Sequence, residues 1–391
     1  MKKTIIMIGG GVQQIKAVKS VQRLGYKILV TDRNPCSPCR EYADYFLNFD
    51  GNDSTGITQY ILNNSKDINI CGVFTLTELV VTAAEVASNL GLPGVSVNSA
   101  IVCQNKSMSK KFWLKENIPT PKGGVFNNLS KAEEFFREYN EVFVKPIEGF
   151  GGIGAGKIKS SKGLKDFFSE NNIGKYIVEE ICDGPMIDVN GYFDKNGSFN
   201  GLGCFEREFI TDKIIESHAY YPCQRDDEII REAYHLTELA CRALNISWGP
   251  VKSDLVLTKS GLKVFEVAPR LHGPKGTLYL AGMVHDKNHL EFILPLIVGK
   301  TLKTNENKMI KKIAAFQIID HPGSAFKQIT GLNIIKDLGY KLLLFKDSLD
   351  AVPNNLDSSN VIGYVFAAAN SEQELIKKLD KINRFIDYKH G

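Results

Sequence analysis

Hydrophobic residues in the first hundred positions alternate between continuous apolar runs and apolar residues at helical spacing. The continuous runs, which are typical of buried strands, are residues 4–8, 27–31 and 70–75, and the helical spacing covers residues 12–24 and 78–90. Strands that alternate with helices in this way indicate a parallel sheet with crossover helices on its faces. We therefore expect a doubly wound α/β domain with a parallel sheet over residues 1–102.

Beyond residue 102 the pattern changes to that of a mixed α and β domain followed by a smaller α+β segment. It predicts helices at 107–117, 130–139 and 226–244, and strands at 142–145, 153–158, 176–181, 187–193, 199–206, 251–257 and 262–267. We expect this domain to span residues 103–300, with subdomains at 103–183 and 184–300. In the α+β remainder, 301–391, strands are predicted at 313–319, 341–346 and 361–368, and a helix capped by Ser371 at 371–385.

Composition and charge narrow the functional classes but name no activity. The chain has 391 residues, of which 43% are hydrophobic and 24% charged, as in globular proteins. Its formal charge of +4 is spread along the chain, so no nucleic-acid partner is expected. No apolar run reaches the roughly 20 residues of a membrane span, so no membrane partner is expected either. The eight cysteines lack the paired spacing of a disulfide scaffold, which favours a reducing cytoplasm.

Two motifs in the first domain admit both a functional and a structural interpretation. Gly9-Gly10-Gly11 follows the first predicted strand and Asp32 ends the second, as in dinucleotide-binding domains. Gln14 stands where such sites need a third glycine for close helix packing, so a tight turn is favoured over NAD binding. Cys36 and Cys39 form a lone Cys-x-x-Cys without the further ligands of a metal site, and a plain loop is favoured there too.

A glycine-rich loop after a strand that ends in lysine is the first candidate for phosphate chemistry. The predicted strand ends at Lys145, and Gly149, Gly151, Gly152 and Gly154 follow it. Glycines let backbone N–H groups approach phosphate oxygens without side-chain clashes, and the lysine supplies positive charge. A glycine-rich hairpin without a ligand has the same composition, so this motif alone leaves both interpretations open.

A predicted hairpin brings two carboxylates face to face. With Lys259-Ser260-Gly261 as a three-residue loop, Asp254 and Glu266 lie directly opposite each other. Opposed carboxylates repel unless a cation or a proton lies between them. Magnesium prefers oxygen ligands from one or two carboxylates together with phosphates. We therefore expect a magnesium site here, with manganese as an alternative ion; a slipped register would instead leave a solvated face.

The order of these motifs along the chain resembles that of a known family. Lys106 precedes Lys145, the segment from Glu179 to Pro185 follows it, and the segment from Phe265 to Arg270 closes the domain. The ordered set resembles the ATP-grasp fold, in which ATP is held between two mixed subdomains. The first domain is similar to the one that precedes ATP-grasp modules in carboxylate–amine ligases, so the resemblance covers residues 1–300.

The resemblance implies a role for each matching residue. Lys106 and Lys145 would contact the ATP phosphates, and the glycines from Gly149 to Gly154 would form a lid over them. Glu179 would face the adenine amino group, and the backbone of Glu180, Ile181 and Cys182 would form the hinge that holds adenine. ATP and magnesium are the implied cofactors. A surface lysine and a buried acid are the alternative interpretations of Lys106 and Glu179.

The chain departs from the family pattern at two positions. Family members usually present Glu-x-Asn-x-Arg, whereas the segment 266–270 carries Ala268 in place of the asparagine, so a third metal-side ligand is missing and the number of ions stays open. With His272 after the arginine, the segment looks like that of some carboxylases and formate-using ligases of purine synthesis. Met186 stands where many relatives place a ribose-binding acid, and Asp188 is the candidate to substitute for it.

Arg270 is the candidate for stabilising phosphoryl transfer. It lies just beyond a predicted strand, where a guanidinium can clamp a phosphoryl group or an acyl phosphate through paired hydrogen bonds. A buried structural salt bridge is its alternative role. Glu216, His218 and His272 are candidates for the substrate site, with His218 following a strand predicted at 213–216.

These inferences predict an ATP-dependent carboxylate–amine ligase. Because a carboxylate is a poor electrophile, ATP would first convert it to an acyl phosphate, which an amine then attacks to give an amide or peptide bond, ADP and phosphate. Alternatives are an ATP-dependent carboxylase or formate-using ligase of the same fold, a dinucleotide-dependent oxidoreductase, and a nucleotide-binding regulator without turnover. The expected partners are a small-molecule carboxylate and an amine, and a homodimer is compatible with the sequence.

Overall fold

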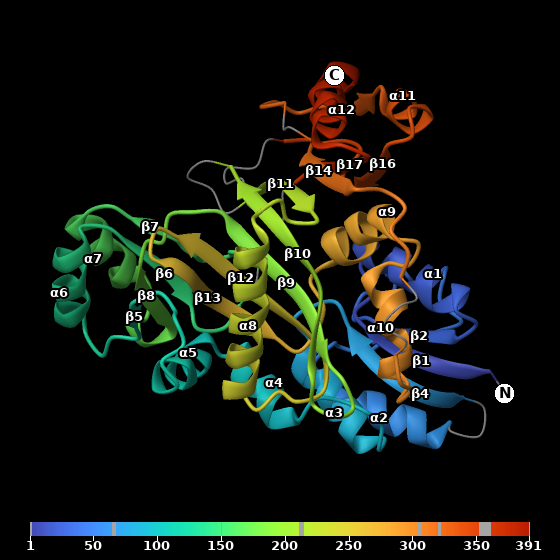
Figure 1. Cartoon of the computed structure of the whole chain (residues 1–391), viewed down its shortest axis with the longest axis horizontal. Helices are drawn as coiled ribbons and strands as arrows, with labels where there is room; N and C mark the ends of the chain where they lie inside the picture. Colours follow the sequence, from blue (N-terminus) through green and yellow to red (C-terminus); the bar gives the residue numbers. More distant parts are fainter. Residues whose placement is uncertain are drawn as a thin grey trace.

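Four sheets organise the part of the chain that the computed structural model describes. The described residues are 2–64, 68–149, 151–210, 215–302, 307–319, 322–351 and 361–390. They form two sheets of four strands, one of eight strands and one of two strands (Figure 1). Within these ranges, none of the helices combines the length and apolar character needed to cross a membrane.

The first domain has a parallel sheet, as the hydrophobic pattern predicts. Its strands β1 (Lys3–Ile8), β2 (Lys27–Thr31), β3 (Tyr45–Leu47) and β4 (Asn69–Thr75) run in the order β3-β2-β1-β4. Its helices are α1 (Ile15–Arg23), α2 (Ser54–Asn63), α3 (Val80–Asn89) and α4 (Val97–Gln104). The last five residues of β1 are all buried, which explains a continuous apolar run in place of an alternating one.

The next part of the chain forms a small antiparallel sheet with two helices packed together beside it, at the left of Figure 1. After α5 (Lys106–Lys115), the strands β5 (Gly123–Gly124), β6 (Val142–Pro146), β7 (Gly156–Ile158) and β8 (Tyr176–Glu180) run in the order β5-β8-β6-β7. The helices α6 (Leu129–Tyr139) and α7 (Ser161–Glu170) bury Phe136 and Leu164 in a core shared with Val142 and Val178 of the sheet.

The eight-stranded sheet forms the centre of the molecule and continues into the C-terminal segment. It contains β9 (Met186–Phe193), β10 (Phe199–Phe209), β11 (Glu216–Tyr221), β12 (Gly249–Thr258), β13 (Gly261–Ala268), β14 (Ile313–Ile318), β16 (Lys341–Leu344) and β17 (Gly363–Ala369), in the order β13-β12-β9-β10-β11-β14-β17-β16. The helix α8 (Asp227–Ala243) lies in front of it in Figure 1 and contacts β9, β12 and β13. The domain division at residue 300 stays a prediction, since this sheet crosses it.

Smaller elements complete the C-terminal segment. They are α11 (Leu332–Asp337), α12 (Glu372–Phe385), and the two-stranded sheet of β15 (Gln328–Thr330) and β18 (Asp387–Lys389). The side chain of Ser371 accepts a hydrogen bond from the Glu374 backbone N–H, as a helix cap does. This confirms the predicted start of the last helix.

The hairpin of β12 and β13 has the predicted pairing of Asp254 with Glu266, but its loop differs from the predicted one. Thr258 pairs with Gly261, so the loop has two residues and the expected three-residue loop is wrong. Leu255 pairs with Val264 and Asp254 with Glu266, which leaves Phe265 as one extra residue in a β-bulge. Without the bulge, Asp254 would face Phe265, and Glu266 would point to the other face of the sheet. The opposition of the two carboxylates is confirmed, and the bulge is its cause.

A helical segment absent from the sequence prediction joins the large sheet to the first domain. It consists of the π-helical turn η3 (Lys275–Leu280), α9 (Ala281–Val284) and α10 (His289–Ile297). Asn288 and Glu291 form a capping box at the start of α10, and the Asn288 side chain also donates to Ser20 Oγ in α1 at 2.9 Å. Buried residues of β1, α1, β4 and α10 share one hydrophobic cluster, so the first domain and α10 share a core.

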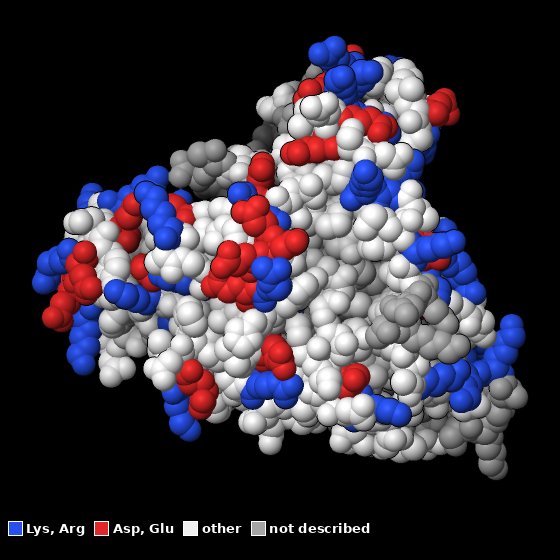
Figure 2. Space-filling model, viewed as in Figure 1, with Lys and Arg blue, Asp and Glu red and all other residues white. Residues whose placement is uncertain are grey.

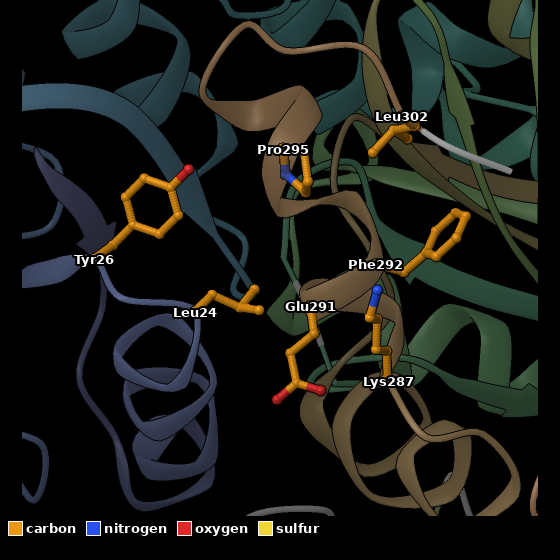
Figure 3. Close-up of a pocket in the computed structure, with 7 residues that line it drawn as sticks. All are labelled: Leu24, Tyr26, Lys287, Glu291, Phe292, Pro295 and Leu302. Atoms are coloured by element: carbon orange, nitrogen blue, oxygen red, sulfur yellow. The ribbon is translucent and has the colours of Figure 1, made fainter. Parts of the chain in front are cut away.

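Figure 3 shows where this junction is incompletely filled. Leu24 and Tyr26 of the first domain face Phe292 and Pro295 of α10 across a pocket of about 190 Å³, and Glu291, which pairs with Arg23, lies between them. The pocket shares no lining residue with the cavity described below. On the face shown in Figure 2, basic and acidic side chains are interspersed without a continuous basic surface.

Candidate active site

A cavity of about 1440 Å³ lies where the first domain, the small sheet, the large sheet and the C-terminal segment meet. Most of the predicted site residues line it. They are Lys106, Lys145, Gly149, Gly151, Gly152, Glu180, Ile181, Cys182, Asp254, Glu266, Arg270, and the substrate candidates Glu216 and His272. Gly154, Glu179, Asp188 and His218 are not among the described residues that line it.

Lys145 is held in the cavity wall by a buried ion pair. Its Nζ lies 2.7 Å from Glu179 Oε2, and Lys110 Nζ lies 2.7 Å from Glu179 Oε1. Burial raises the pKa of Glu179, but the two ammonium groups outweigh this, so that its pKa lies below the ordinary value and the carboxylate is charged. Lys145 Nζ also lies 5.0 Å from the centre of the Phe265 ring. The bulge that aligns the carboxylates therefore also contributes to holding Lys145.

Glu179 points toward these lysines and away from the cavity. It is 2% exposed, and its carboxylate is shared by two cations in the wall behind Lys145. This arrangement gives it a positioning role for Lys145, while the predicted contact with adenine stays untested.

Lys106 connects the start of α5 to the glycine-rich loop. Its Nζ donates a 2.7 Å hydrogen bond to the carbonyl oxygen of Gly149, and its backbone N–H donates to the Ile147 carbonyl. Gly149, Gly151, Gly152 and Gly154 all have positive φ, between 63° and 138°, a conformation that favours glycine. The loop thus depends on glycine at each of these positions, and Lys106 holds one end of it.

The predicted hinge segment connects the two subdomains. Glu180 accepts hydrogen bonds from the Lys122 backbone N–H at 2.7 Å and from Lys263 Nζ of β13 at 2.6 Å. Ile181 and Cys182 follow it along the cavity wall. The ion pair between Glu180 and Lys263 therefore links the small sheet to the large one at the edge of the cavity.

The opposed carboxylates of Asp254 and Glu266 are accompanied by a lysine that sequence reasoning missed. Lys252 Nζ lies 3.1 Å and 3.0 Å from the two oxygens of Asp254 and 2.7 Å from Glu266 Oε1. Burial lowers the pKa of Lys252, but the two carboxylates outweigh it and raise the pKa above the ordinary value. The available signal was its position two residues before Asp254, on the same face of a strand that is otherwise mostly apolar.

Arg207 of β10 contacts two further carboxylates, Asp188 and Glu216, and also lies near Asp254 of this pair. Its Nη2 donates to Asp188 Oδ1 at 2.7 Å, its Nε also contacts Asp188, its Nη1 donates to Glu216 Oε1 at 2.7 Å, and Nη2 lies 3.5 Å from Asp254 Oδ2. Asp188 is 2% exposed, pairs with Arg207 and is not among the described residues that line the cavity. Its predicted contact with ribose stays a hypothesis.

Glu216 is held between Arg207 and Lys275, and all three line the cavity. Burial raises the pKa of Glu216, but Lys275 and Arg207 outweigh it and bring the pKa to about 2. Lys275 contacts Tyr364, whose ring centre lies 4.1 Å from its Nζ. Neither Arg207 nor Lys275 was identified from the sequence.

His272 lies between the two aspartates of this wall. Its Nε2 is 3.1 Å from Asp254 Oδ1, its Nδ1 is 3.6 Å from Asp188 Oδ2, and its backbone N–H donates to Asn190 Oδ1 at 2.8 Å. Ligand atoms of the three side chains lie within 4.8 Å of one another, as a metal site requires. The guanidinium of Arg207 already pairs with Asp188, with Nη2 as the hydrogen-bond donor, so an added cation there would meet a positive charge.

Arg270 is 5% exposed and connects the large sheet to the first domain. Its Nη1 donates to the Leu271 carbonyl at 2.9 Å, and its Nη2 pairs with Glu78, which precedes α3. Its Nε has no hydrogen-bond partner among the described residues. Both interpretations of Arg270 are therefore open, since it lines the cavity and also forms the interdomain ion pair.

His218 is the one substrate candidate that the structure places away from the others. It lies inside β11, opposite Glu208 and Gln317, so the strand predicted at 213–216 was misplaced; residues 211–214 lie outside the described residues. Glu216 begins β11 and faces the cavity, whereas His218 does not line it.

The glycine turn of the first domain also lines the cavity but is closed by the protein itself. Asp32 Oδ2 accepts a 2.8 Å hydrogen bond from the Gly10 backbone N–H. Cys39 Sγ contacts the Gly11 carbonyl at 3.4 Å, and burial raises the pKa of Cys39 to about 12, which disfavours a thiolate ligand. All eight cysteines, which the described ranges include, are free, and Cys36 is the exposed one.

Comparison with known proteins adds a family match and several distant relatives. A model described as "ATP-grasp domain" matches residues 103–274. The chain is 26% identical over 286 residues to the 3-methyl-D-ornithine–L-lysine ligase of Methanosarcina mazei, covering 72% of this chain and 69% of the relative. It is 23% identical over 312 residues to the formate-dependent phosphoribosylglycinamide formyltransferase of Bacteroides thetaiotaomicron, covering 76% and 77%.

Among solved structures, the L-amino acid ligase from Bacillus licheniformis superposes with a TM-score of 0.85. The match covers 100% of this chain and 99% of that one at 19% sequence identity. At this identity the likeness shows a shared fold over the whole chain, which includes the C-terminal segment beyond the family match.

Proposed function

We propose that the chain belongs to the ATP-grasp superfamily and is an ATP-dependent carboxylate–amine ligase, since residues 103–274 match the ATP-grasp domain model and the whole chain shares the fold of an L-amino acid ligase. The proposed reaction phosphorylates a carboxylate with ATP and then lets an amine displace phosphate, with ADP as the nucleotide product. The relatives named for joining amino acids support amino acids as the substrate class.

One observation carries this proposal. Lys145 and the glycines from Gly149 to Gly152 line the same cavity as the opposed carboxylates of Asp254 and Glu266. A triphosphate needs cationic groups and backbone N–H donors, and its divalent ion needs oxygen ligands. The phosphate-binding groups and the carboxylates line one cavity. Ion pairs within the protein already hold Lys145 and Glu266 in place when no ligand is bound.

In the proposed mechanism, Lys145 and Lys106 bind phosphate oxygens, and the glycine loop covers them and excludes water from the acyl phosphate. Asp254 and Glu266 fit a magnesium ion, because both are carboxylates on one face of the sheet and both line the cavity. Bound there, magnesium would offset negative charge on the phosphates. Arg270 would stabilise the charge on the phosphoryl group during transfer.

The amino-acid substrates would occupy the part of the cavity lined by Arg207, Glu216 and Lys275. Arg207 and Lys275 are cations that can orient a carboxylate, while Glu216 remains charged and can accept hydrogen bonds from an ammonium group. Among the described residues of the C-terminal segment, Phe345 and Tyr364 line this cavity. The segment would therefore help to select the substrate side chain.

The decisive experiment measures ADP release from ATP and magnesium across a matrix of amino acids offered in pairs, with AMP measured alongside. ADP release that requires a carboxylate and an amine together supports the ligase. AMP release would indicate adenylation instead and would contradict the proposed acyl phosphate. If the protein binds ATP but releases no ADP with all of the amino-acid pairs, a nucleotide-binding regulator would be favoured.

A second candidate function follows from His272 and Ala268 together with the formyltransferase relative. We propose bicarbonate and formate as additional substrates in the same assay. ADP release that depends on formate or bicarbonate, and not on an amino-acid carboxylate, would identify a formate-using ligase or a carboxylase of the same fold.

A further inference from the structure

The ammonium group of Lys252 lies where two carboxylates would otherwise need a metal ion. Lys252 and Asp254 lie two residues apart on one face of β12, and Glu266 approaches the same point from β13. Lys252 Nζ is 2.7 Å from Glu266 and 3.0–3.1 Å from the Asp254 oxygens. The side chain of Lys252 is 5% exposed, so this ammonium is fixed in the wall and not free in solvent.

The residue opposite Lys252 makes room for it. In the hairpin register, Lys252 pairs with Ala268, whose methyl group offers no ligand atom and leaves space above the sheet. An oxygen ligand at this position would compete with Lys252 for the same volume. Lys252 and Ala268 therefore occupy the position where a third metal ligand could have joined the carboxylates of Asp254 and Glu266.

The charges around Asp254 disfavour a second ion. Besides Lys252, Asp254 Oδ2 lies 3.5 Å from Arg207 Nη2, and Asp254 Oδ1 lies 3.1 Å from His272 Nε2. Each added cation near a lysine and an arginine is repelled by both, and this repulsion is strong where water is excluded. Glu266 Oε2 has no hydrogen-bond partner in the described part of the chain, so one oxygen remains for an ion that the nucleotide brings.

We propose that the Lys252 ammonium fills the place of one divalent cation, so that the nucleotide-loaded site takes a single divalent ion. This inference rests on the proposed function, because it concerns the metal that accompanies ATP. Lys252 is then a positioning residue, which keeps Asp254 and Glu266 together before the nucleotide binds and supplies a permanent positive charge that no chelator removes.

The test counts manganese ions. Manganese(II) is titrated into the full-length protein saturated with a non-hydrolysable ATP analogue, and free manganese is measured by electron paramagnetic resonance. We expect one bound ion in the wild type. Lys252→Met keeps the length of the side chain and removes its charge, so we expect a second ion to bind, with affinity at least about tenfold above any second-site binding in the wild type.

Two matched variants separate charge from packing. Lys252→Arg retains a cation and should keep one ion. Arg225→Met removes a more exposed ion pair with Glu206 outside the cavity and should leave the count at one.

Each outcome decides between the alternatives. Two ions in the wild type, or a count that stays at one in a folded Lys252→Met protein, would overturn the role of Lys252 while leaving the ligase proposal intact. If Lys252→Met does not fold by circular dichroism, Lys252→Gln, which also removes the charge, takes its place in the titration. A wild type that binds the nucleotide but no manganese would contradict the metal site, and with it both proposals.

Discussion

Lys145 and Glu266 approach the proposed triphosphate from different subdomains, and their substitution should separate binding from turnover. Lys145→Ala removes a cation held by Glu179, so we expect the Kd for ATP to rise about tenfold or more. Glu266→Gln keeps the size of the side chain and removes its charge, so ATP binding should remain detectable while ADP formation falls about 100-fold or more. Calorimetric titration and an ADP assay measure the two quantities.

The exposed Lys195, in the turn between β9 and β10, provides the control for a lost lysine. Lys195→Ala should change neither the Kd nor the rate. Normal ADP formation by Glu266→Gln would contradict the assigned metal role.

Glu216 should make the stability of the protein depend on pH. Its pKa falls from 4.5 to about 2 in the folded protein, so its stabilisation is fully present above pH 4.5 and is lost as the pH falls toward 2. At neutral pH the shift corresponds to about 3 kcal/mol. In urea unfolding, the stability advantage of the wild type over Glu216→Gln should therefore shrink as the pH falls from 5 to 3.

Glu372→Gln, which alters an exposed carboxyl group on α12, is the control for the substitution itself. A difference between the wild type and Glu216→Gln that is constant across this range would contradict the ion pairs with Lys275 and Arg207.

At the scale of elements, the cap of α10 should contribute more than an ordinary helix cap. The Asn288 side chain accepts from the Glu291 backbone N–H at 3.0 Å and donates to Ser20 Oγ in the first domain at 2.9 Å. Asn288→Ala removes both contacts in a buried place, so we expect a loss of about 2 kcal/mol in the free energy of unfolding, at the upper end of cap substitutions. Urea denaturation followed by circular dichroism measures it.

Asn128 caps α6 with a single hydrogen bond to the Lys131 backbone N–H and serves as the reference. Asn128→Ala should cost about 1 kcal/mol or less. Equal losses for the two variants would mean that the bond to Ser20 adds nothing across the junction.

The helices and strands that could be predicted are those whose own residues show a clear hydrophobic pattern, either a continuous apolar run or an apolar face. The strands β1, β2 and β4 are buried on both faces and give continuous apolar runs, and α8 has a clear polar face. In contrast, α10 is buried nearly all round and contains Pro295, so its sequence carries no helical period. The strand β3 has three residues, too few for a pattern.

The same limit applies to the candidate site. The glycine loop, Asp254 and Glu266 are local signals, and the structure places them around one cavity. Lys252, Arg207 and Lys275 were missed because their significance comes from partners on other strands or helices, which spacing alone does not reveal. The hairpin register was correct although its loop was wrong, because the Phe265 bulge compensates for the shorter turn.

At the scale of the whole molecule, the first domain depends on its contact with the rest of the chain. Gly72 of β4 lies against α10, where an added Cβ would come within 2.9 Å of the Ile297 carbonyl oxygen and 3.0 Å of its Cγ2. Gly72→Val would force the two units apart, so we expect a loss of about 1–3 kcal/mol and a lower Tm. Thermal unfolding by calorimetry measures the change.

Gly124 of β5 is the matched control, since it is also a strand glycine and has no heavy atom within 4 Å of an added Cβ. Gly124→Val should change the stability by no more than about 0.5 kcal/mol. An unchanged Tm for Gly72→Val would mean that β4 and α10 can move apart without a loss of stability.

The distribution of thiols offers a practical route to follow ligand entry. Cys36 is exposed, whereas the other cysteines, all within the described ranges, are buried or half-buried. Asp32 and Arg33, a few positions earlier, line the cavity. A maleimide fluorophore would therefore attach preferentially beside the cavity wall, and its emission could report nucleotide and amino-acid arrival in the unmutated chain.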